Sequence, residues 1–245
     1  MHTSAGQRLI LLFAVSLTAG FLSAAATAGT VSDVFFRIDV ESTLGTEYFE
    51  VLTSDPDVHY DPVTSTWWWR DSGISLGDVA FLNSAGLTIV GDPQMALDFA
   101  LTAGAADTTV TIASAVLSFD ALEDAFGLAS VGVTLTETGG APSASLIGLA
   151  GENGNAFAAL YNIVPPGSVF AEFISELHTS TSTSDSDDTD GFIPFGETVT
   201  SMQTQYSFTL TAHDQASSTG VYVIPEPATL ALLVLGGLIL GRHRG

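Results

Sequence analysis

The chain has 245 residues, with 5 basic side chains, all arginine, against 27 acidic ones, a net charge of −22, and no cysteine or lysine. This length suits one large β domain or two small domains, with room for a sizeable core. The acidity excludes a general nucleic-acid binder, because phosphate contacts need a basic patch. The missing cysteine excludes thiol nucleophiles, thiolate metal sites and disulfides, and the missing lysine excludes Schiff-base catalysis.

Residues 1–28 have the composition of a secretory signal peptide. Arg8 is followed by an apolar run at 9–22, and Ala26-Thr27-Ala28 offers a small-residue cleavage site. The apolar run is short for a membrane span and leads directly into that site. We therefore expect cleavage after Ala28; the alternative is an uncleaved N-terminal anchor.

Residues 29–223 have the pattern of an all-β domain. Apolar and polar residues alternate at 95–102, 131–136 and 201–212, as they do in half-buried antiparallel strands with a polar outer face. Turn residues recur between such runs, which gives about ten or eleven short strands. The sequence predicts an antiparallel β-sandwich or jelly roll.

Three local features refine that prediction. Asn153-Gly154 lies between the apolar runs 146–149 and 157–161, which predicts a hairpin. A change of phase predicts a bulge near Ala113-Ser114. Residues 170–177 have apolar side chains at i, i+3, i+4 and i+7, which predicts a helix, with a strand as the alternative.

The C-terminal segment 224–245 has three parts in a fixed order. Pro225-Glu226-Pro227 comes first, an apolar stretch at 228–241 follows, and Arg242 and Arg244 lie at the end. As a helix, the apolar stretch is about 21 Å long, short for a hydrocarbon core of about 30 Å, although terminal arginines can reach the interface. Arg242 and Arg244 are expected to stop transfer and to keep that end on the cytoplasmic side.

This tail resembles a PEP-CTERM sorting signal, and the resemblance covers residues 224–245. It implies export through the signal peptide, transient anchoring by the C-terminal transmembrane helix, and recognition by an exosortase-like membrane protease. The residues implied in recognition are Pro225, Glu226 and Pro227. Proteins with such tails belong to bacteria that make extracellular polysaccharide, so the expected destination is the cell surface or matrix. The resemblance implies a sorting route and no activity.

Residues 186–197 nearly match a calcium-binding loop, the one cofactor site that the sequence suggests. Asp188, Asp190 and Glu197 fall at positions 3, 5 and 12, with Gly191 at position 6. Position 1 is serine instead of aspartate, and no helix is predicted to follow. A solvated Ser/Thr/Asp linker is the alternative, and it is the commoner meaning of such a composition.

Trp67, Trp68 and Trp69 are adjacent, so a strand would place Trp67 and Trp69 on one face and Trp68 on the other. Exposed tryptophans stack on sugar rings, which makes Trp67 and Trp69 candidates for carbohydrate binding. Packing in the core is the alternative, because three neighbouring bulky residues must include at least one that points inward.

Gly73-Ile74-Ser75-Leu76-Gly77 matches the G-x-S-x-G pattern of a serine nucleophile. The pattern needs a strand-to-helix turn, and no helix is predicted after Gly77. His178 and His213 could supply a base, but nothing in the local sequence positions either of them. A turn between strands is the favoured interpretation.

These observations predict a non-enzymatic, exported surface or matrix protein with an acidic β domain. Residues 29–223 hold 2 arginines and 26 of the 27 acids, a net charge of about −24. The partners expected are an exosortase-like protease, the membrane through the C-terminal helix, and extracellular polysaccharide, with no nucleic acid. The alternatives are a carbohydrate-binding module and a secreted hydrolase.

Overall fold

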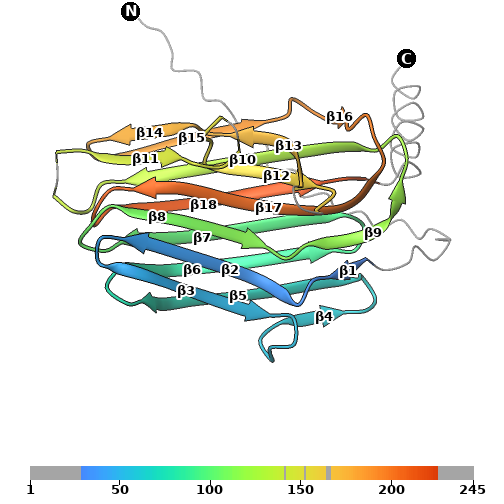
Figure 1. Cartoon of the computed structure of the whole chain (residues 1–245), viewed down its shortest axis with the longest axis horizontal. Helices are drawn as coiled ribbons and strands as arrows, with labels where there is room; N and C mark the ends of the chain where they lie inside the picture. Colours follow the sequence, from blue (N-terminus) through green and yellow to red (C-terminus); the bar gives the residue numbers. More distant parts are fainter. Residues whose placement is uncertain (1–28, 141, 152, 164–166, 226–245) are drawn as a thin grey trace, which may run out of the picture.

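A computed structural model of the whole chain describes residues 29–140, 142–151, 153–163 and 167–225. The predicted signal peptide, residues 1–28, and the predicted sorting tail from Glu226 onward lie outside these residues. Within them every regular element is a strand, and the strands form two antiparallel sheets. Figure 1 looks through both layers, and the strands of the two sheets overlap in a sandwich-like arrangement. The prediction of an all-β, antiparallel fold is confirmed.

The larger sheet has ten strands, in the order β1-β9-β17-β8-β2-β3, with β11, β12, β13 and β14 on the other side of β17. Its strands are β1 (Thr30–Val31), β2 (Val34–Ser42), β3 (Gly45–Leu52), β8 (Thr108–Ser114), β9 (Leu117–Leu122), β11 (Ala144–Gly148), β12 (Phe157–Tyr161), β13 (Ser168–Phe173), β14 (Glu176–Thr179) and β17 (Val199–Leu210).

The smaller sheet has eight strands, in the order β15-β10-β18-β7-β6-β5-β4, with β16 paired to β10. Its strands are β4 (His59–Asp61), β5 (Thr66–Leu76), β6 (Ala80–Val90), β7 (Gln94–Ala103), β10 (Phe126–Thr136), β15 (Ser182–Asp188), β16 (Ile193–Pro194) and β18 (Gln215–Val223). The three runs with the clearest alternation in the sequence correspond to β7, β10 and β17.

The strand β17 organises the larger sheet because each of its sides is covered by two short strands laid end to end. On one side β8 pairs with residues 205–210, and β9 pairs with residues 199–202. Ala113 pairs with Gln205 and Leu117 pairs with Met202. The chain between β8 and β9 therefore has one residue more than the stretch of β17 that it faces. The predicted bulge therefore exists, and Ser114 Oγ fills it by accepting a hydrogen bond from the Thr204 N–H at 3.0 Å.

The predicted hairpin is wrong. The strands β11 and β12 do not pair with each other: both pair with β17, β11 at residues 208–210 and β12 at residues 202–206. The Asn153-Gly154 turn joins them as a short loop closed by the Ala150–Asn155 bridge. The 12 residues of β17 can pair with both strands, whereas β11 and β12 have only five residues each with which to pair with one another.

The predicted helix at 170–177 is also absent. The chain there forms the end of β13 and the start of β14, separated by Ile174, with a φ of 63°, and Ser175. Phe170 stacks on Phe195 and on Tyr222, with ring centroids 4.4 and 5.4 Å apart. The extended backbone allows these long-range ring contacts. Their contribution to stability is larger than what a helix of eight residues would gain from the spacing of its apolar side chains.

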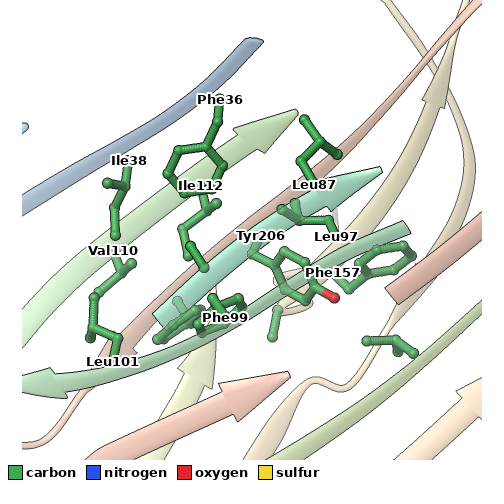
Figure 2. Packing of buried hydrophobic residues seen from close by; sticks show 14 of the residues in the cluster. Phe36, Ile38, Leu87, Leu97, Phe99, Leu101, Val110, Ile112, Phe157 and Tyr206 are labelled. Carbon is green, nitrogen blue, oxygen red and sulfur yellow. The ribbon is translucent and has the colours of Figure 1, made fainter. Parts of the chain in front are cut away.

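The core lies between the two sheets and consists of the inward residues of both. Figure 2 shows Phe36, Val110 and Ile112 of the larger sheet close to Leu97 and Phe99 of the smaller one. All five are buried. Burying such side chains contributes about 1.5–3 kcal/mol each before the entropy cost of ordering the chain. With few ion pairs available, this burial and the backbone ladders hold the domain together.

Tyr206 of β17 crosses from the larger sheet to the smaller one. Its ring is fully buried between Phe99 and Phe157, with centroids 5.0 and 5.1 Å away. Its hydroxyl lies 3.0 Å from Ser218 Oγ on β18, and burial raises its pKa well above the usual value. Gly220 of β18 makes room for this ring, because a Cβ there would come within 2.4 Å of the Tyr206 hydroxyl oxygen. The two sheets are thus locked together at this point.

Candidate functional site

The hairpin β4–β5 builds the most distinctive surface feature. Its turn is held by Asp61, whose carboxylate accepts hydrogen bonds from the Val63 N–H and the Thr64 hydroxyl, both at 2.9 Å. These bonds, the Val63 N–H first, lower the pKa of Asp61 below its usual value. The ladder then pairs His59 with Trp68 across the two strands.

The alternation of β5 separates the three tryptophans. Trp69 is 3% exposed and packs on Phe36 at 4.9 Å, so it belongs to the core. Trp67 is half-buried and stacks on Tyr60 at 4.4 Å. Trp68 points the other way, is 40% exposed, and has the His59 ring 5.2 Å away. The aromatic platform available to a ligand is therefore Trp68 and not the predicted pair Trp67 and Trp69.

Trp68 forms part of a cleft of about 350 Å³, lined by Asp57, His59, Trp68, Arg70 and Asp71. The cleft combines one aromatic face, two carboxylates, an imidazole and a guanidinium. Groups of these kinds bind sugars, since an indole ring covers the apolar face of a pyranose and charged groups bond its hydroxyls.

Arg70 is fixed at the edge of this cleft by Asp98 of β7. Its Nη2 lies 3.2 Å from Asp98 Oδ1, across the intervening strand β6. The residue between them is Gly86, where a Cβ would lie 3.0 Å from Arg70 Nε and 2.9 Å from Asp98 Oδ1. The absence of a side chain at Gly86 allows the two charges to meet over the sheet. Because both groups are partly exposed, this pair orients Arg70 more than it stabilises the fold.

The acidic stretch predicted as a calcium loop takes a different form. Residues up to Asp188 belong to the edge strand β15, and the Asp190 N–H donates to Asp188 Oδ1 at 2.5 Å. Glu197 instead accepts a hydrogen bond from the Tyr161 hydroxyl at 2.6 Å. Burial and this carboxylate both raise the pKa of Tyr161. Across the described ranges, no group of three or more His, Cys, Asp or Glu side chains is arranged to hold a metal ion.

Ser75 lies near the end of β5, and Gly77 follows in a turn with a φ of 58°. The Ser75 hydroxyl oxygen lies 3.4 Å from the Gly77 carbonyl oxygen. His178 is on β14, 3.5 Å from Glu176, and His213 lies in the turn between β17 and β18. Neither histidine belongs to a strand that pairs with β5.

The tail is described only as far as Pro225. The Ile224 N–H donates to the Pro93 carbonyl at 2.8 Å, and Ile224 and Pro225 are buried. Glu226, Pro227, Arg242 and Arg244 lie outside the described residues. Among residues 29–225, as far as they are described, no helix has the length and apolar character needed to cross a membrane.

No protein-family model matches the chain, and no curated protein matches it. Among solved structures, it is similar to one titled "Cryo-EM Atomic Structure of Broad Bean Stain Virus (BBSV)", with 9% sequence identity and a TM-score of 0.23. The match covers 85% of this chain and 94% of that chain. A similarity at this TM-score supports no inference about function.

Proposed function

We propose that this chain is an exported, non-enzymatic surface or matrix protein that binds extracellular polysaccharide. Export and sorting follow from the signal peptide and the PEP-CTERM-like tail, both read from the sequence. An exosortase-like protease processes the tail, and the β domain is left at the cell surface. The binding role rests on one observation, the exposed face of Trp68 inside a cleft with polar and charged walls.

The architecture supports a binding role in a second way. The cleft lies on the outer face of a sheet whose inner face is core, so Trp68, Arg70 and Asp71 are held by the ladder between β5 and β6, and His59 is held by its pairing with Trp68. A preorganised site loses little conformational entropy when a ligand binds. Sugar recognition benefits from such rigidity, since each contact to a hydrated hydroxyl is individually weak.

Replacing Trp68 by alanine is expected to weaken binding to a glycan at least tenfold, because stacking on an exposed aromatic ring supplies much of the affinity. The measurement is a glycan array followed by titration calorimetry on the best oligosaccharide. Phe81→Ala is the matched control, since Phe81 is 43% exposed on β6 and lies outside the cleft. Equal binding by the wild type and Trp68→Ala would contradict the proposed site.

The sorting route is tested at Glu226, the only charged residue between Asp214 and Arg242. Glu226→Ala is expected to leave export intact and to accumulate a membrane-bound form of larger mass, because the protease loses its one charged contact. Mass spectrometry of the C-terminus in the native host measures this. Glu197→Ala, an acid outside the tail, is expected to be processed normally.

Deletion of residues 229–245 completes the sorting test. It is expected to release soluble protein, since residues 29–228 contain no further apolar stretch long enough to span a membrane. A wild-type surface protein that still ends at Gly245 would reject processing and would leave a plain C-terminal anchor.

A further inference from the structure

The outer face of the smaller sheet continues from the Trp68 cleft as a path of small side chains. The ladder aligns residues of successive strands in two adjacent rows that cross the strands. The first row is His59, Trp68, Thr88, Ala96, Val221, Ser130 and Asp188, and the second is Arg70, Gly86, Asp98, Thr219, Gly132 and Ser186. Beyond Trp68 and Arg70, no position in either row has a side chain larger than aspartate or valine.

These rows point away from the core. Along β7 and β18 the buried residues alternate with the row residues, so Phe99 and Tyr222 point inward while Asp98 and Val221 are partly exposed. At the far side, hydroxyl pairs follow the same face, with Thr134 Oγ1 2.8 Å from Ser184 Oγ. From Trp68 on β5 to Asp188 on β15 the path crosses five strand spacings, about 24 Å at the usual 4.8 Å between strands.

We infer that this path binds an extended polysaccharide of amino sugars, running across the strands with one end on Trp68. The inference rests on the proposed function and specifies its ligand. The dimensions suit a chain, because a path about 24 Å long with no bulky side chain accommodates several consecutive sugar rings. The exposed hydroxyls of serine and threonine provide donors and acceptors along its length.

The charges along the path decide between classes of polysaccharide. Asp57 and Asp71 line the cleft, Asp98 lies near the middle and Asp188 at the far end. The one cation in the two rows, Arg70, is already paired with Asp98, so this pair adds no net charge and the negative charge of the path comes from Asp57, Asp71 and Asp188. A uronic-acid polymer meets repulsion here, and the domain carries a net charge of about −24. The ammonium groups of an amino-sugar chain meet complementary carboxylates.

The test is titration calorimetry of the full-length protein in detergent with three series of oligosaccharides of increasing length: glucosamine, N-acetylglucosamine and uronic acid. At low salt, glucosamine oligomers are expected to bind about tenfold more tightly than their acetylated counterparts, as two or three exposed ion pairs would give. Affinity is expected to rise with length until the oligomer spans the sheet, and the preference is expected to shrink at high salt.

Gly132→Gln tests the path itself, because a Cβ at Gly132 has nothing within 4 Å and the side chain would stand in the second row between Thr219 and Ser186. It is expected to reduce the affinity for long oligomers to that of short ones, while short oligomers still bind at Trp68. Phe81→Ala is expected to leave the affinities for long and for short oligomers unchanged.

The outcomes separate the two proposals. Binding that does not depend on length, or that Gly132→Gln leaves intact, overturns the path. Equal affinity for glucosamine and N-acetylglucosamine oligomers overturns the amino-sugar assignment and leaves a site for neutral glycans. Absence of binding in all three series overturns the proposed function along with this inference.

Discussion

Replacing Gly220 by alanine is expected to lower the free energy of unfolding by about 3 kcal/mol, the upper part of the range for overpacking a well-filled core. The added Cβ would lie 2.4 Å from the Tyr206 hydroxyl oxygen and 2.7 Å from Phe157 Cε2. Both rings are fully buried, so neither can move aside without disturbing the contact between the sheets. Urea unfolding followed by circular dichroism measures the change.

Gly132→Ala is the matched control for that substitution. Gly132 lies on the neighbouring strand β10, but its Cβ would point to open space on the outer face. Alanine there is expected to be neutral or to stabilise by up to about 1 kcal/mol, because glycine loses more backbone entropy on folding. Similar losses in the two variants would show that glycine is required for its backbone and not for the space it leaves.

Replacing Asp214 by alanine is expected to cost about 3 kcal/mol, since two hydrogen bonds to a buried carboxylate are lost and their donors remain. Asp214 is fully buried in the turn between β17 and β18. Its carboxylate accepts hydrogen bonds from the Thr138 N–H at 3.1 Å and from the Thr211 hydroxyl. It thereby ties the segment after β10 to this turn.

Two further variants test whether the stability depends on the hydrogen bonds of the Asp214 carboxylate. Asp214→Asn keeps one carbonyl oxygen as an acceptor and is expected to cost less than Asp214→Ala. Asp107→Ala removes an exposed carboxylate that accepts from the Ala212 N–H near the same turn, at 3.0 Å. It is expected to cost about 1 kcal/mol or less. If all three variants unfold at the same urea concentration, Asp214 does not hold the turn.

The sequence predicted strands best where alternation ran longest. The strands β7 and β10 each bury every second residue over ten or more positions, and β17 buries every second residue from Met202 to Leu210, with Ser207 buried as well. This period is visible without a structure. Short elements were harder, because their pairing depends on partners far along the chain. The stretch 170–177 has helical spacing, yet ring contacts of Phe170 with distant residues favour extended backbone.

The candidate site was predicted only in part, for a similar reason. Alternation correctly separated Trp68 from Trp67 and Trp69, but one strand cannot show which of its faces another sheet covers. That face is settled by Phe36 and Phe49, which pack on Trp69 from the opposite sheet. The residue types of Asp71-Ser72-Gly73 are those of a turn, whereas β5 continues through these residues with Gly73 at a φ of 75°. No motif or spacing in the sequence indicated that Asp57, His59 and Arg70 lie together in one cleft.

The position of β18 has a mechanical consequence. This last strand is paired over nine residues with β10 on one side and over nine with β7 on the other. A pull on Pro225 acts along the strand, while its ladder hydrogen bonds run across it. The hydrogen bonds on both sides of β18 are therefore loaded together in shear. They must break at the same time and cannot break one after another. Under the proposed sorting route, a domain held by this end withstands traction far better than one held through an edge strand.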